Sequence, residues 1–105
     1  MPEEHAKRHA KDLRKGRVSL PGQVYHVTAV TRDRAPVFSD LYSARLLVNA
    51  LREAQARDAA ATLAYVVMPD HVHWLMQLGT TTSLSQVVGA VKAVTAHRIG
   101  GRVWQ

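Results

Sequence analysis

Residues 63–76 constrain the fold more than any other part of the chain, because two apolar runs there flank the sequence Met-Pro-Asp at positions 68–70. Proline presets its own backbone angle, and aspartate can hydrogen-bond to nearby amides, so this is turn chemistry. Runs rich in valine, leucine and aromatic residues on both sides of such a turn predict two strands in a tight hairpin. We expect these strands over residues 62–68 and 71–78.

Two histidines, His71 and His73, come directly after the turn. Side chains two positions apart on a strand point to the same face, so both imidazoles share one face while Val72 and Trp74 share the other. One interpretation is a pair of exposed polar residues on a solvated sheet, which the short spacing alone favours. The other is half of a divalent-metal site that needs further ligands.

The remaining segments with a regular pattern complete the expected fold. A strand is predicted over residues 23–31, helices are predicted over 41–57 and 84–99, and a further strand begins at 102–105. The order strand, helix, strand, strand, helix is that of a ferredoxin-like α+β sandwich, with an antiparallel sheet and two helices on one face. The fourth strand is cut short at the C-terminus.

Composition narrows the class of protein. The 105 residues contain no cysteine, which excludes disulfides and thiolate zinc sites, and no apolar run is long enough to span a membrane. A formal charge of +6 favours a polyanionic partner. Residues 1–19 are interpreted as a basic arm, or as a solvated tail, preceding one domain over residues 20–105. We expect a cytoplasmic protein.

Four basic or histidine side chains are candidates for contacts with DNA. His26 shares a strand face with Thr28, and that face is expected to carry the two histidines of the hairpin. Arg32 and Arg34 follow the end of the same strand and are candidates for phosphate contacts. Lys92 lies at the edge of a helix stripe, where its ammonium reaches out. Each of the four also has a plain interpretation as a solvated surface side chain.

The hairpin sequence Met-Pro-Asp-His-Val-His-Trp-Leu-Met at positions 68–76, after Tyr-Val-Val, resembles the motif of single-tyrosine HUH transposases, in particular the REP-associated tyrosine transposases. Asp70 stands where many members carry asparagine. Three further segments are similar to family segments: Tyr-His-Val-Thr at 25–28, Val-Lys-Ala-Val-Thr at 91–95 and Val-Trp-Gln at 103–105. The resemblance covers residues 20–105.

The resemblance implies cleavage and rejoining of single-stranded DNA, with a repetitive extragenic palindrome hairpin as substrate. A divalent metal, Mg or Mn, held by His71 and His73 would assist attack by a tyrosine, giving a 5′-phosphotyrosine intermediate. The family carries that tyrosine on a later helix, to which no segment here corresponds, and Tyr25, Tyr42 and Tyr65 stand elsewhere. We therefore expect a chain that binds DNA but does not cut it alone.

Two other classes of function stay open. A non-catalytic nucleic-acid-binding module of the same fold would need aromatic rings on the exposed sheet face, where this sequence places histidines and threonine. A metal-binding domain of another function, such as a zinc site, would need more ligands than two histidines. The short fourth strand leaves a sheet edge unpaired, which allows pairing with a second copy in a homodimer.

Overall fold

Three strands and two long helices form residues 19–105, the part of the chain that the computed structural model describes. The predicted basic arm of residues 1–19 lies outside the described residues, except for Ser19. The elements are β1 (Val24–Val30), α2 (Leu41–Ala56), β2 (Ala60–Met68), β3 (His71–Leu78) and α3 (Leu84–Ile99), with short 3-10 turns η1 (Arg32–Arg34) and η2 (Val37–Ser39) after β1. This order confirms the predicted α+β sandwich.

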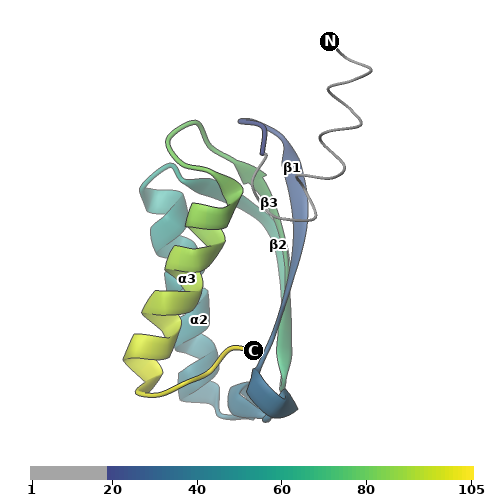
Figure 1. Ribbon diagram of the computed structural model, residues 1–105, viewed down its shortest axis with the longest axis vertical. Coiled ribbons are helices and arrows are strands. Elements are labelled where there is room, and N and C mark those ends of the chain that lie inside the picture. The colour runs from purple at the N-terminus through teal and green to yellow at the C-terminus, as the bar shows by residue number, and fades with distance from the viewer. Residues whose placement is uncertain (1–18) are drawn as a thin grey trace.

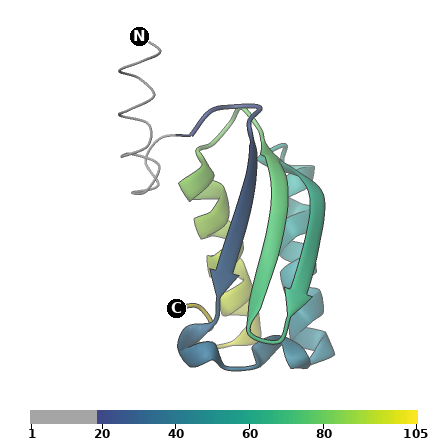
Figure 2. The same cartoon turned by 90° about the vertical axis from the view of Figure 1, so that its right-hand side faces the viewer.

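The strands form an antiparallel sheet in the order β1-β3-β2, so the hairpin strand β3 lies in the middle. Both helices cover the same face of the sheet (Figure 1). Figure 2 looks onto the other face, which no helix of residues 19–105 covers; we call it the helix-free face. The register places Thr28 and Val66 opposite His73 on the two neighbouring strands, which fixes the cross-strand neighbours of the site.

Alternation along β3 divides its side chains between the core and the helix-free face. Four side chains at every second position of β3 are buried: Val72, Trp74, Met76 and Leu78. The helices meet them with Leu47, Leu51, Val87 and Val91, all of which are buried. Trp74 satisfies its indole nitrogen there, since Nε1 donates to Oγ1 of Thr62 at 2.9 Å. Burial of these apolar surfaces is the main stabilising contribution to the fold.

The ends of the helices agree with their sequence signals. Asp40 caps α2 by accepting a hydrogen bond from the backbone nitrogen of Ser43 at 3.0 Å. Ser83 and Gln86 form a capping box at the start of α3, and Gly100 ends that helix with a positive φ of 96°. Glu53 and Arg98 connect the two helices through paired hydrogen bonds of 2.8 and 3.0 Å. No helix among residues 19–105 is long and apolar enough to cross a membrane.

Strand β2 begins at Ala60, two residues before the predicted start. Alanines at positions 59–61 hid this start, because alanine has a low strand propensity. Pairing with β3 overrides that propensity, and the register then shifts between Thr62 and Ala64, where the strand bulges at Leu63.

The C-terminal residues add a short extension beside β1. Trp104 forms an isolated antiparallel bridge with Thr31, and Arg32 donates its backbone N–H to the carbonyl of Val103 at 2.8 Å. Gln105 donates to the carbonyl of Val30 at 3.0 Å. These contacts place the start of the predicted fourth strand beside β1, although only one residue pair forms a bridge.

A matched pair of glycine substitutions tests the packing of the fold. A Cβ at Gly79 would fall against the backbone carbonyl oxygen of Asp58, whereas a Cβ at Gly89 of α3 meets no atom within 4 Å. Gly79→Ala should lower the free energy of unfolding by about 1–3 kcal/mol. Gly89→Ala should raise it by about 0.5–1 kcal/mol, because alanine restricts the unfolded chain. Urea denaturation measures both, and equal effects would contradict the described loop.

Candidate metal and DNA-binding site

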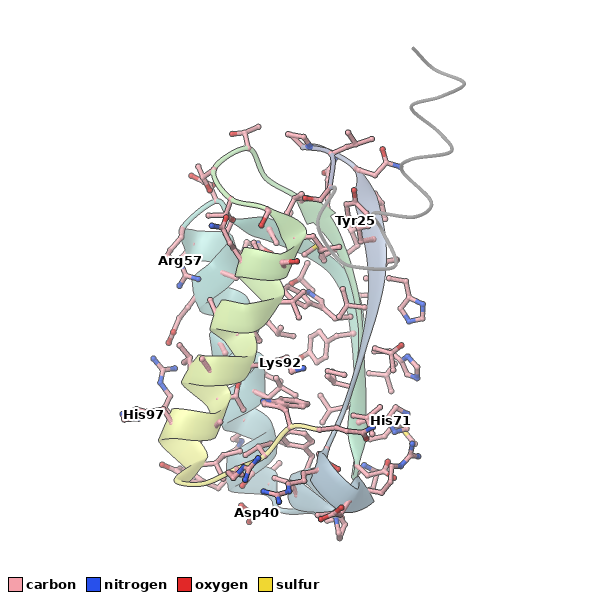
Figure 3. The ribbon with its side chains drawn as sticks, viewed as in Figure 1. Tyr25, Asp40, Arg57, His71, Lys92 and His97 are labelled. Carbon is pink, nitrogen blue, oxygen red and sulfur yellow. The ribbon has the colours of Figure 1, made fainter. Side chains whose placement is uncertain are left out.

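His71 and His73 lie side by side on the helix-free face, as the alternation predicted. Their ring centroids are 4.9 Å apart and the rings are nearly perpendicular, at 88°. Val72 and Trp74 lie on the opposite face with 4% and 2% exposure. Figure 3 shows His71 projecting away from the helices. The described geometry therefore brings two imidazoles to one open surface.

His71 is held by the aspartate that precedes it. Nδ1 of His71 lies 2.7 Å from Oδ1 of Asp70, and Nε of Arg34 lies 2.9 Å from the other oxygen, Oδ2. A carboxylate only accepts hydrogen bonds, so Nδ1 of His71 is the donor. Donation by His71 first, and by Arg34 second, lowers the pKa of Asp70 below its ordinary value.

The backbone of the hairpin turn is anchored by the segment that follows β1. Thr31 donates to the carbonyl of Asp70 through its backbone nitrogen at 2.9 Å and through Oγ1 at 3.0 Å. The N–H of Phe38 donates to the carbonyl of Pro69 at 2.9 Å. Asp33 and Arg34 both have a φ of 55°, in the left-handed region. The segment around η1 therefore lies against the hairpin turn, where Arg34 contacts Asp70.

His73 contacts two side chains of β1. Its Nδ1 lies 3.2 Å from Oγ1 of Thr28 and 3.1 Å from Nε2 of His26. The His26 and His73 ring centroids are 5.2 Å apart. His26 therefore lies beside the pair, where the strand alternation placed it. Contacts at Nδ1 of both hairpin histidines leave their Nε2 atoms without a partner among residues 19–105.

An apolar hollow adjoins the histidines on the side of β2. Six residues line it: His26, Ala64, Tyr65, Val66, His73 and Leu75. Val66 and Leu75 are 53% and 37% exposed, so this half of the helix-free face presents apolar side chains to solvent. The histidines stand at the boundary between this apolar area and the charged turn of Asp70 and Arg34.

The other predicted site residues are more distant or more weakly held. Arg32 is exposed, and its nearest charged partner is Asp33 at 3.9 Å. Lys92 belongs to α3 on the opposite side of the sheet, and its Nζ lies 5.8 Å from the ring centroid of Trp104 (Figure 3). The structure thus does not bring Lys92 together with the histidines, and a DNA contact by Lys92 stays a prediction.

None of the tyrosines has a hydrogen bond or ring contact with these imidazoles within the described part of the chain. Tyr25 pairs with Met76 on the helix-covered face, and its hydroxyl accepts from the backbone nitrogen of Leu20 at 2.8 Å. Tyr42 lies on α2 and is 66% exposed. Tyr65 pairs with Trp74 and borders both the hollow and α2.

Two imidazole nitrogens without partners are donors of the kind that divalent ions take, and two of them would fill only part of a coordination sphere. No group of three or more histidine, aspartate or glutamate side chains among residues 19–105 is arranged to hold a metal. A closed structural zinc site is therefore not formed by these residues. A metal half-site at His71 and His73 stays a prediction.

Sequence reasoning missed the contact between Asp70 and His71, because it treated Asp70 only as a turn residue. An acidic residue directly before a candidate histidine ligand was the available signal, since such ligands commonly donate their second nitrogen to a carboxylate. Thr28 was placed on the correct face, but its contact with His73 depends on the strand register, which the sequence does not specify.

A family model for IS200-like transposases matches residues 19–104. No curated protein matches the chain. A solved structure of a REP-associated tyrosine transposase bound to a REP hairpin aligns with a TM-score of 0.70 and 23% identity, covering 85% of this chain and 55% of that one. A Deinococcus radiodurans structure described as a transposase aligns with a TM-score of 0.68 and 27% identity, covering 86% and 78%.

Fold and sequence together define a transposase-type domain. Because the family model spans most of the chain, the chain belongs to the IS200-like transposase family. The predicted resemblance to that class is confirmed. The chain spans about half the length of the hairpin-bound transposase that it matches.

Acid should remove the stabilising effect of Asp70. A carboxyl whose pKa is lowered by folding stabilises the fold above its unfolded pKa, about 3.9, and loses this effect as the pH falls through the folded pKa. Asp70→Asn should therefore be less stable than the wild type at pH 7, with a margin that shrinks below about pH 4. Urea denaturation at several pH values measures this margin.

The control is Asp33→Asn, which removes the same charge from a side chain that is 90% exposed. Its free energy of unfolding should stay within about 0.5 kcal/mol of the wild type. A margin for Asp70→Asn that widens on acidification would contradict the described contacts.

Proposed function

We propose that this domain binds single-stranded or hairpin DNA and holds a divalent metal, Mg or Mn, through Nε2 of His71 and Nε2 of His73. The observation that carries the proposal is the pair of adjacent imidazoles on the helix-free face, each with Nδ1 engaged and Nε2 without a partner in the described chain. A bound divalent ion would neutralise charge on a phosphate oxygen of the DNA and polarise its phosphorus.

The chain's own residues would orient the DNA around these histidines. Arg32 is exposed, and Arg34 uses only Nε for Asp70, so its terminal nitrogens remain for a phosphate. Both arginines follow the end of β1, on the same side of the turn as His71. Phosphate contacts there would place the backbone of a strand across the imidazoles. The apolar hollow beside His73 offers an adjoining surface for an unstacked base.

The reaction that we propose for the complete site is cleavage of single-stranded DNA by a tyrosine. The tyrosine oxygen bonds to the phosphorus, giving a 5′-phosphotyrosine, and the bond from phosphorus to the 3′ oxygen breaks, leaving a free 3′-hydroxyl. Tyr25, Tyr42 and Tyr65 have no hydrogen bond or ring contact with the imidazoles among residues 19–105, and these positions do not support assigning the nucleophile to any of them. The described residues contribute metal ligands and DNA contacts. A hairpin as substrate is supported by the hairpin bound to the structurally similar transposase.

A nucleic-acid module of the RNA-recognition type has less support. That mode of binding stacks bases on aromatic rings of the exposed sheet face. Here Tyr25 and Trp74 lie on the helix-covered face, and the centre of the exposed face carries histidines, Thr28 and Leu75. No observation favours this second candidate over the metal site.

Removal of either proposed ligand should weaken metal binding. His71→Ala and His73→Ala should each lower the affinity for Mn²⁺ by more than ~100-fold. Loss of a residue that only hydrogen-bonds a metal ligand already costs ~10–100-fold, and loss of the ligand itself should cost more. His97→Ala is the matched control, because His97 is exposed on α3 on the other side of the molecule (Figure 3). Titration followed by the electron paramagnetic resonance of free Mn²⁺ gives the affinities. A loss with His97→Ala instead would place the ion elsewhere.

DNA affinity should depend on salt through the loop after β1. Replacing Arg32 and Arg34 with alanine should flatten the slope of log affinity against log salt by about 0.7 for each phosphate that the protein no longer binds. Fluorescence anisotropy with a labelled single strand, without metal, measures the slope. Arg45→Ala with Arg52→Ala is the control, since it removes equal charge from exposed positions of α2. A slope that flattens only in this control would move the DNA to α2.

A further inference from the structure

The side chain of Asp70 connects a proposed metal ligand to a basic residue from another segment. Oδ1 accepts from Nδ1 of His71 at 2.7 Å, and Oδ2 accepts from Nε of Arg34 at 2.9 Å. Each oxygen of the carboxylate therefore accepts one hydrogen bond, and the negative charge of the acceptor strengthens both bonds. Asp70 and His71 are also largely covered, with 25% and 21% of their side-chain surfaces exposed. Rotation of the carboxylate would break one of these two contacts.

We propose that Asp70, clamped by Arg34, is a positioning residue that fixes His71 in the tautomer with its proton on Nδ1 and a free electron pair on Nε2. This inference rests on the proposed function, because it treats His71 as a metal ligand. The hydrogen bond that one imidazole nitrogen makes determines the state of the other. A carboxylate behind the ring also makes the imidazole a stronger electron donor.

The two histidines differ in this respect. Nδ1 of His73 faces the hydroxyl of Thr28 and a ring nitrogen of His26, and each of these groups can donate or accept. Their geometry allows either tautomer of His73. Only Asp70 imposes one direction on its hydrogen bond, since a carboxylate cannot donate. His71 is therefore the ligand whose orientation and tautomer are set before an ion arrives.

The turn itself does not depend on the Asp70 side chain, which makes substitutions interpretable. The backbone carbonyl of Asp70 is held at 2.9 and 3.0 Å by the nitrogen and the hydroxyl of Thr31. Asp70→Ala removes only the carboxylate. Asp70→Asn leaves one acceptor oxygen for two donors, so its amide nitrogen can face Nδ1 of His71 instead. Asp33→Asn removes a nearby charge that touches neither histidine.

The first test measures tautomers by ¹⁵N NMR of the imidazoles, on the full chain without metal and at about pH 8.5, where histidine is neutral. The wild type and Asp33→Asn should show His71 protonated on Nδ1. Asp70→Ala should shift His71 toward protonation on Nε2. A wild-type His71 protonated on Nε2, or an unchanged tautomer in Asp70→Ala, would overturn the inference.

The second test measures Mn²⁺ affinity by electron paramagnetic resonance. Asp70→Ala should weaken binding about 10–100-fold, and Asp33→Asn should leave it unchanged. Arg34→Ala, which frees Oδ2 of Asp70, should give a smaller loss in the same direction. Equal affinity in the wild type and Asp70→Ala would overturn the positioning role while the proposed function stands. A wild-type chain that binds no Mn²⁺ would overturn the proposed function, whatever the tautomer of His71.

Discussion

The alternation of side chains along β3 is the constraint on which the core and the candidate site both depend. Trp74 and Met76 fill the space under the helices, while His71 and His73 emerge between them on the other face. A shift of one residue in the register would bury both imidazoles and expose the tryptophan, at a large cost in free energy. Burial of the core therefore fixes the direction in which the histidines point.

The position of β3 in the middle of the sheet extends this constraint to its neighbours. Strand β1 brings Thr28 and His26 to one side of His73, and β2 brings the apolar Val66 to the other. At the start of β3, Thr31 and Phe38 donate hydrogen bonds to the carbonyls of the hairpin turn. The adjoining strand β2 and the distant residues 26–38 thus support the two histidines, which is the arrangement expected when a site must keep its geometry.

Much of this architecture follows from local sequence pattern. The second hairpin strand, β3, and the helix α3 have the bounds that the sequence predicted. Pro-Asp before β3 and Gly-Gly after α3 are strong local signals for a turn and for a helix end. The start of β2 could not be predicted, because tertiary pairing of an alanine-rich segment overrides its propensity. Period-two alternation was sufficient to place His26, His71 and His73 on one face.

The contacts within the site were beyond sequence reasoning. Arg34 reaches Asp70 from a segment in which two successive residues, Asp33 and Arg34, adopt left-handed backbone angles. Aspartate tolerates this conformation, but nothing in the local sequence requires it. The contact of Thr28 with His73 depends on the register between β1 and β3, which is set by packing of the whole sheet. Lys92 was associated with DNA from its helix alone, and the structure places it across the sheet from the histidines.

Anomalous diffraction from crystals of the chain grown with Mn²⁺ tests the central claim most directly, because the anomalous signal locates the ion without reference to activity. The account predicts one strong peak on the helix-free face, within coordination distance of Nε2 of both His71 and His73, with Nδ1 of His71 still on Asp70. A peak bound by only one of these histidines, by Nδ1 of His73 with His26, or at a site away from β3 would contradict it.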